Sequence, residues 1–196
     1  MTTTKKHWPS SSLIIVAHPN KQSFSHKIAD QIISYYTSKW IPFHLLDLYD
    51  HPQWFLKLSE TNRPLEDNAI DRMQTLIKDA DELIFCFPLR RFDCPAILKN
   101  RMEVNLTSGF AYRYRHGKIL PEKLLKGKTA RVFITAWWPT RAYRFLSWFI
   151  RLLRYIGRIN YVGMSLKSWT LFPDMNHYKT PHSRQWMLDT VRRVIR

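Results

Sequence analysis

The sequence predicts an α/β protein built as a three-layer sandwich, in which helices cover both faces of a five-stranded parallel sheet. Three observations support this fold class. Short, almost wholly apolar runs recur along the chain, as is typical of strands that are covered on both faces. Each run is followed by a segment whose apolar residues repeat with a period of about 3.6 residues, as in an amphipathic helix. The two kinds of segment alternate, and the common order for such a sheet is 2-1-3-4-5.

Each element is predicted from its own segment of the chain. The expected strands span residues 13–17, 43–48, 83–87, 131–136 and 161–171. One long helix is expected over residues 142–157, and Pro95 is expected to open the helix before it. The other helices are marked by four apolar stripes: Ile28, Ile32, Ile33 and Tyr36; Ile70, Met73, Leu76, Ile77 and Ala80; Ile97, Leu98, Met102 and Leu106; and Met187, Val191, Val194 and Ile195.

The composition is that of one packed globular domain. The chain has 196 residues, of which 45% are hydrophobic and 23% charged. Residues 1–12 are polar and lack a period, so we expect a flexible N-terminal arm followed by a single domain over residues 13–196. No apolar run reaches the roughly 18 residues that a spanning helix needs. A cytoplasmic protein without a secretion signal is therefore expected.

Several function classes are disfavoured by the residues that are present. The five glycines do not fit the G-x-G-x-x-G, P-loop or G-x-S-x-G patterns of nucleotide-binding proteins and hydrolases. Neither Cys86 nor Cys94 belongs to a C-x-x-C pair, and the eight histidines lack the paired spacing of metal ligands. We therefore expect reduced thiols and no metal site. The formal net charge of +16 instead favours anionic ligands, acidic membranes or nucleic acid.

The predicted topology places a ligand site at the carboxyl ends of strands 1 and 3, where the strand order reverses. Three loops meet there, at residues 18–25, 88–94 and 135–143. The first loop supplies an imidazole, serine hydroxyls and a helix N-terminus, which together suit a phosphate group. For Ser23 and Ser25 the alternative is simple capping of the following helix.

These segments carry motifs with a recognisable pattern: Ala17-His18-Pro19 followed by Ser23-Phe24; Asp47-Leu48-Tyr49; Phe87-Pro88-Leu89 with Phe92 and Pro95-Ala96-Ile97-Leu98-Lys99; Gly109-Phe110-Ala111-Tyr112; and Leu125-Lys126-Gly127-Lys128. On these motifs, the chain resembles the flavodoxin-like NAD(P)H:quinone reductases over residues 13 to about 143. That family includes DT-diaphorase-like enzymes and the ancillary flavoproteins of bacterial potassium-efflux channels. The resemblance implies a flavodoxin-like sandwich and a flavin-dependent oxidoreductase that passes a hydride from NAD(P)H to a quinone or a related small acceptor.

The resemblance also implies roles for particular residues. The cofactor would be FMN or FAD, with its phosphate bound by His18, Ser23, Phe24 and Ser25 and its ring by Pro88, Leu89, Arg90, Arg91 and Phe92. Thr135 and Ala136 match the loop after strand 4, and Tyr143 is the candidate catalytic residue, placed near the flavin and the acceptor oxygen. Trp137 belongs to the expected substrate pocket. Tyr112 and Tyr114 match aromatics that close the pocket of the partner subunit in a homodimer.

Three departures from the family pattern leave a second hypothesis open. Arg90 and Arg91 replace an aromatic pair, Asp93 replaces a glycine, and Trp137-Trp138 stands where quinone reductases commonly have two glycines. The alternative function is a basic, non-catalytic binding or regulatory module that keeps the scaffold and has lost flavin.

The helix expected at residues 142–157 bears on the partners. Its arginines gather on one face together with Trp148 and Tyr155. Such a face suits a subunit interface, an anionic membrane surface or a membrane protein. The alternative is a helix face that is only exposed to solvent, and binding of nucleic acid is ranked last. A peripheral place at the inner face of a membrane is therefore expected along with the cytoplasm.

Overall fold

In the computed structural model, the described residues are 10–50, 67–91, 93–137, 159–176 and 180–196. Their centre is a five-stranded sheet of order β2-β1-β3-β6-β7, and every neighbouring pair of strands is parallel. The sheet order predicted from the sequence is confirmed. The strands are β1 (Ser12–Val16), β2 (Phe43–Asp47), β3 (Glu82–Pro88), β6 (Thr129–Thr135) and β7 (Ser165–Phe172).

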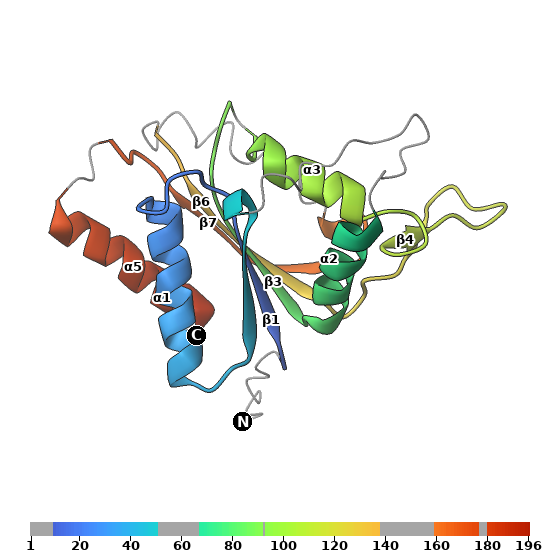
Figure 1. Cartoon of the computed structure of the whole chain (residues 1–196), viewed down its shortest axis with the longest axis horizontal. Helices are drawn as coiled ribbons and strands as arrows, with labels where there is room; N and C mark the ends of the chain where they lie inside the picture. Colours follow the sequence, from blue (N-terminus) through green and yellow to red (C-terminus); the bar gives the residue numbers. More distant parts are fainter. Residues whose placement is uncertain (1–9, 51–66, 92, 138–158, 177–179) are drawn as a thin grey trace, which may run out of the picture.

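Helices cover both faces of this sheet, which confirms the three-layer sandwich (Figure 1). The helices α1 (Phe24–Ser38) and α5 (Pro181–Ile195) lie on one face, and α2 (Asp67–Asp79) and α3 (Ala96–Asn105) lie on the other. A short 3-10 helix, η1 (Leu48–Asp50), follows β2. Alternate residues of the buried strands serve the two layers, because successive side chains of a strand point to opposite faces. Thus Leu13 and Ile15 pack toward α2 and α3, whereas Ile14 and Val16 pack toward α1 and α5.

Strand β1 begins at Ser12, one residue before the predicted start. The amide of Ser10 already donates to Asp81 Oδ2 at 2.7 Å, and the amide of Asp81 donates to the carbonyl of Ser11. Residues 10–12 are thus bound to the loop before β3, while residues 1–9 lie outside the described part of the chain.

The start of the last strand differs from the prediction. We expected the strand over residues 161–171, but β7 begins at Ser165 and residues 161–163 form a turn. Gly163 has a φ of +102°, and its amide donates to the carbonyl of Asn160. A β-carbon at Gly163 would lie 2.9 Å from Lys123 Cβ. The turn is therefore fixed by a close approach to another segment, which the apolar run alone does not reveal.

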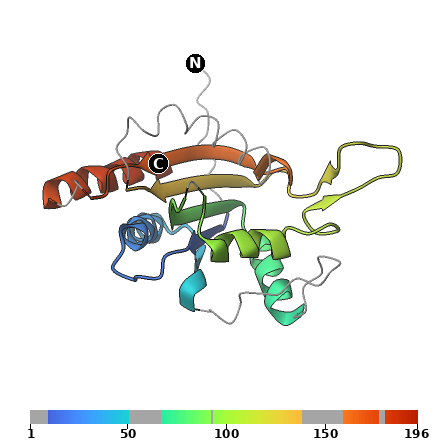
Figure 2. The same cartoon turned by 90° about the horizontal axis from the view of Figure 1, so that it is seen from above.

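A two-stranded antiparallel hairpin was not predicted. Strands β4 (Tyr112–Arg113) and β5 (Glu122–Lys123) are each two residues long, too short to show a period in the sequence. The hairpin projects from the α2 and α3 side of the molecule, far from α1 and α5 (Figures 1 and 2).

Three expectations fall on residues that the structure does not describe: the helix over 142–157 with its arginine face, Trp138, and the loop residues Phe92 and Tyr143. Among the helices of the described residues, none combines the length and apolar character needed to cross a membrane.

Candidate functional site

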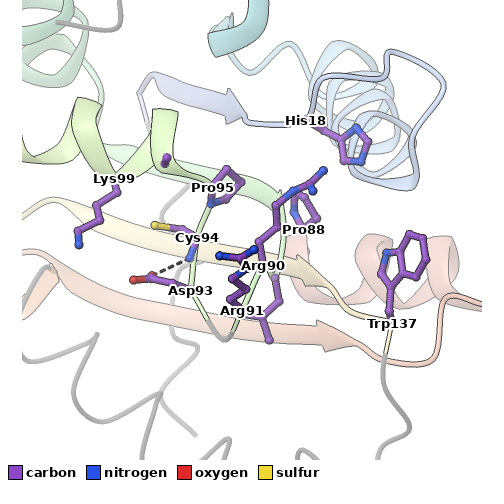
Figure 3. Close-up of a pocket in the computed structure, with 11 residues that line it drawn as sticks. His18, Pro88, Arg90, Arg91, Asp93, Cys94, Pro95, Lys99 and Trp137 are labelled. Atoms are coloured by element: carbon purple, nitrogen blue, oxygen red, sulfur yellow. Dashed lines mark hydrogen bonds between the residues drawn. The ribbon is translucent and has the colours of Figure 1, made fainter.

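A cavity of about 950 Å³ opens at the carboxyl end of the sheet, where β1 and β3 lie side by side (Figure 3). This is the position predicted from the reversal in strand order. The walls come from the turn after β3, the first turns of α3, and single residues after β1 and β6. The lining residues are Pro88, Leu89, Arg90, Arg91, Asp93, Cys94, Pro95, Ala96, Lys99, His18 and Trp137.

The turn after β3 is closed by its own backbone. The amide of Arg90 donates to the carbonyl of Asp93, and the amide of Asp93 donates back to the carbonyl of Arg90, both at 2.8 Å. Between them, Arg91 adopts a left-handed φ of +47°. The Asp93 side chain accepts a hydrogen bond from the Cys94 amide at 2.6 Å. The turn therefore engages its carboxylate internally and leaves two arginine side chains along the cavity.

His18 follows β1 and lies at one end of the cavity, with the side chain of Arg90 extending toward it (Figure 3). His18 Nδ1 lies within hydrogen-bond distance of both the amide and the carbonyl oxygen of Asn20, at 3.0 and 3.1 Å. Burial lowers the pKa of His18 below its ordinary value, and the positive charge of Arg90 acts in the same direction. The neutral form of the ring is therefore favoured, and a neutral imidazole still carries one N–H that can donate a hydrogen bond.

Ser23 is the N-cap of α1. Its Oγ accepts a hydrogen bond from the His26 amide at 3.3 Å, so the capping alternative holds for this residue. The cap satisfies only one of the first backbone amides of α1, because the first four amides of an α-helix have no acceptor within the helix. The N-terminus of α1 thus remains suited to an anion.

Phe24, Ser25, Thr135 and Ala136 do not line the cavity, although Thr135 pairs with the lining residue Pro88 and Ala136 precedes Trp137. Ser25 Oγ and Thr135 Oγ1 are 3.5 Å apart and both side chains are buried. Phe24 packs edge-on against Phe172, and the Ala136 amide donates to the carbonyl of Phe172. These predicted residues join the start of α1 to the ends of β6 and β7.

Tyr112 and Tyr114 do not reach this cavity within one chain. They lie on the hairpin in an aromatic cluster with Tyr161, in which Tyr114 Oη and Tyr161 Oη are 2.7 Å apart. That hydrogen bond, helped by burial, raises the pKa of Tyr161 to about 12. Tyr161 was not singled out from the sequence, since the segment was taken for a strand.

A hydrogen-bonded chain that sequence reasoning missed holds the loop after β1 in place. Asp47 Oδ2 accepts from His26 Nε2 at 2.6 Å and from Lys21 Nζ at 2.5 Å, and His26 Nδ1 lies 2.9 Å from Ser23 Oγ. Burial raises the pKa of Asp47, but the hydrogen bonds from Lys21 and His26 outweigh it and lower the pKa overall. The sequence signal that could have pointed to this hydrogen-bonded chain is the position of Asp47 in the Asp47-Leu48-Tyr49 motif.

Lys99 lines the cavity although it was not predicted as functional, and it ends the motif that opens α3. Trp137 lines the cavity as expected, with 65% of its surface exposed. Within the described ranges, no group of three or more His, Cys, Asp or Glu side chains could hold a metal ion.

Comparisons with known proteins agree with this architecture. The model of a family described as having a flavodoxin-like fold matches residues 10–189. An uncharacterized NAD(P)H oxidoreductase of Haemophilus influenzae is 29% identical over 188 residues, which covers 90% of each chain. The glutathione-regulated potassium-efflux system ancillary protein KefG of Cronobacter sakazakii is 30% identical over 133 residues, and the match spans 67% of this chain and 61% of that protein.

Solved structures share the fold. The structure of Smu.1420 from Streptococcus mutans superposes with a TM-score of 0.80 at 26% identity and covers 95% of this chain and 98% of that one. An NAD(P)H:quinone oxidoreductase from Methanothermobacter marburgensis gives a TM-score of 0.76 at 24% identity, covering 95% and 96%. The general stress protein 14 of Treponema denticola, solved in complex with FMN, gives 0.68 at 24% identity, covering 94% and 95%.

Proposed function

Because this chain belongs to the flavodoxin-like fold family, we propose that it is a flavin-dependent oxidoreductase that transfers a hydride from NAD(P)H to a quinone or a related small acceptor. The observation that carries the proposal is the cavity at the carboxyl end of the sheet, which is lined by His18 in the loop before α1 and by the first turn of α3. An NAD(P)H oxidoreductase among the relatives and an FMN complex among the similar structures also support it.

The residues present fit a flavin in their chemistry. Pro88, Pro95 and Trp137 give apolar surface for a flat ring, and the volume of about 950 Å³ lies within the range of cofactor pockets. The imidazole of His18 and the first amides of α1, which have no acceptor within the helix, suit the phosphate group. The cofactor would be FMN or FAD.

Each residue then has a definite task. His18 and Ser23, with the main chain of Phe24 and Ser25, would hold the phosphate, while Thr135 and Ala136 keep the start of α1 against the sheet. The turn over residues 88–92 would hold the ring. A bound flavin supplies the hydride acceptor and donor that no side chain of this protein provides. Orientation and exclusion of water are the contribution of the protein.

Tyr143 is the residue that we propose donates a hydrogen bond to the acceptor oxygen as negative charge develops there. In the sequence, Tyr143 follows Trp137, which lies after β6. Replacing Tyr143 by Phe should slow acceptor reduction and leave flavin binding nearly unchanged. Equal losses in both would remove this role.

The proposed assembly is a homodimer. Tyr112 and Tyr114 contact Tyr161 on a hairpin that projects from the α2 and α3 side of the molecule (Figure 2), and neither tyrosine lines the cavity of its own chain. In that position they are available to close the pocket of a second copy.

The proposed location is the cytoplasm, with peripheral contact to an anionic membrane or a membrane protein. The formal net charge of +16 and the name of KefG as an ancillary protein of a potassium-efflux system support this contact.

A second candidate function is the basic, non-catalytic binding module on the same scaffold. The lining of the cavity by Arg90, Arg91 and Trp137, where the resembling enzymes have aromatic residues or glycines, favours it.

The deciding experiment is an absorbance spectrum of the purified protein, with the released cofactor identified by mass and NAD(P)H oxidation followed with a quinone. We expect a flavin spectrum and quinone-dependent oxidation. His18→Ala should weaken flavin binding, whereas Lys118→Gln, an exposed change on the hairpin, should not. Colourless protein that neither FMN nor FAD reconstitutes, yet that binds anionic vesicles with steep salt dependence, would establish the binding module instead.

A further inference from the structure

The cavity is strongly asymmetric in charge. Among its described lining residues, Arg90, Arg91 and Lys99 are positive, and Asp93 carries the one carboxylate. That carboxylate accepts a hydrogen bond from the Cys94 amide at 2.6 Å, so it is turned into its own loop. An anionic ligand is therefore favoured over a neutral one by the field of this site.

The positive groups lie at different ends of the cavity. Arg90 extends toward His18, the end that the proposed function assigns to the flavin phosphate, whereas Lys99 lies at the opposite end (Figure 3). Lys99 is half-exposed and lies 3.9 Å from Glu103, a long and therefore weak ion pair. Lys99 has no part in the proposed flavin contacts, and Arg91 enters them only as a member of the turn after β3.

Arg91 occupies a backbone position that disfavours it. Its φ of +47° is a conformation that glycine or asparagine adopts more readily, and the two hydrogen bonds between Arg90 and Asp93 hold it there. An unfavourable conformation retained in a binding loop points to a task for the side chain. Apolar surface from Pro95 and Trp137 completes a cavity suited to an aromatic ring that bears an acidic group.

We propose that Arg91, assisted by Lys99, binds an acidic group of the electron acceptor, so that the preferred acceptor is an aromatic carboxylate or sulfonate. This inference rests on the proposed function and names its substrate class. The acidic group is unchanged by the reaction. NAD(P)H gives two electrons and a proton as hydride, a second proton comes from solvent, and a quinone becomes a hydroquinone while NAD(P)⁺ is released.

Binding can be tested without any redox reaction. The probes are naphthalene-2-sulfonate and its neutral match naphthalene-2-sulfonamide, titrated by calorimetry into the protein as purified. The sulfonate should bind about tenfold more tightly, as expected for one charge-assisted contact. Arg91→Asn suits the left-handed backbone and should abolish this preference, and Arg91→Lys should retain most of it.

Lys118→Gln is the matched control, because it removes one positive charge from an exposed position on the hairpin. It should leave the preference intact. Equal affinity of the wild-type protein for the two probes would overturn the inference. So would a loss in Lys118→Gln as large as in Arg91→Asn, since that would reflect the general field of the protein.

Kinetics distinguish the acceptor from the phosphate of the hydride donor. Arg91→Asn should raise the ratio of KM for 1,2-naphthoquinone-4-sulfonate to KM for 1,2-naphthoquinone about tenfold, and any effect of the variant on the flavin cancels in this ratio. A rise in KM for NADPH alone, with KM for NADH and for both quinones unaffected, would assign Arg91 to the phosphate of the hydride donor and overturn the proposal. If no flavin binds, the proposed function fails, and the two naphthalene probes still decide the inference about Arg91.

Discussion

Glu82 and Arg131 form a hydrogen-bonded ion pair between the neighbouring strands β3 and β6, with 3.0 Å between Glu82 Oε1 and Arg131 Nε. The Glu82 side chain is fully buried and also accepts from Tyr36 Oη at 2.8 Å, and it lies 3.2 Å from Lys167 Nζ. Arg131 donates in addition to the carbonyl of Val194 in α5. This cluster connects the strands β3, β6 and β7 to α1 and α5, and it lies toward the amino-terminal ends of the strands, whereas the cavity lies at their carboxyl ends.

Replacing Glu82 by Gln should lower the free energy of unfolding by about 3 to 5 kcal/mol, because a buried guanidinium then loses its counter-charge. The measurement is urea denaturation at pH 7. Glu103→Gln is the matched control, since Glu103 is half-exposed and its pair with Lys99 is 3.9 Å long. Its loss should stay below about 0.5 kcal/mol. Similar losses in the two variants would show that the buried pair is not a main source of stability.

The same ion pair predicts a dependence on pH. Burial by itself raises the pKa of Glu82, but the charge of Arg131, with the hydrogen bonds to this carboxylate, outweighs burial and lowers the pKa below 4.5. A pKa lower in the folded state gives stability that is present above 4.5 and lost as the pH falls through the folded value. The stability difference between wild type and Glu82→Gln should therefore shrink in denaturation series below pH 4.5. A difference that is the same at pH 7 and pH 3 contradicts this.

Asp47→Asn should lower the free energy of unfolding by about 1 to 3 kcal/mol, because it weakens hydrogen bonds from two potentially charged donors, His26 and Lys21. Urea denaturation at pH 7 measures the loss. Asp50 also pairs with Lys21 but is largely exposed, so Asp50→Asn should cost less than about 1 kcal/mol. An equal effect of the two variants would mean that the burial of Asp47 contributes nothing.

The sheet order and the location of the cavity follow from the sequence because they depend on local signals. Buried strands such as β1 and β3 are nearly continuous apolar runs, and the alternation of strands with helices restricts the topology to few choices. The carboxyl ends of β1 and β3 then define where a ligand is expected to bind. The placement of His18, Arg90 and Trp137 at the cavity followed from this logic.

What the sequence did not reveal depends on contacts between distant segments. The turn that displaces the start of β7 is set by the approach of Gly163 to Lys123. The hydrogen bond from His26 to Asp47 joins residues on different elements, and each residue alone resembles many others on a protein surface. The role of Lys99 depends on which side of α3 faces the cavity, which an apolar stripe fixes only for the core.

Alkylation should distinguish the two free cysteines. Cys86 is fully buried in β3, and burial raises the pKa of its thiol, so the reactive thiolate is scarce. Cys94 is also buried, but it lines the cavity. With iodoacetamide at pH 8, mass spectrometry of peptides should show Cys94 modified at least about tenfold faster than Cys86. In urea the two should react alike. Equal rates in the native protein would mean that β3 opens as readily as the cavity.

The left-handed backbone of Arg91 predicts which substitutions it tolerates. Arg91→Asn should change the free energy of unfolding by less than about 0.5 kcal/mol, whereas Arg91→Val should lower it by about 1 to 2 kcal/mol, because a β-branched residue is strained at a φ of +47°. Arg113→Val in the extended strand β4 is the control and should be nearly neutral. Urea denaturation at pH 7 compares all three.

Should Arg91→Val prove as stable as Arg113→Val, the turn after β3 must be able to adopt another conformation, and the position of the Arg91 side chain along the cavity would not be fixed. If instead the valine variant alone is destabilised, the turn is rigid. A loss of sulfonate binding in the stable Arg91→Asn variant then results from removal of the guanidinium and not from unfolding of the loop that carries it.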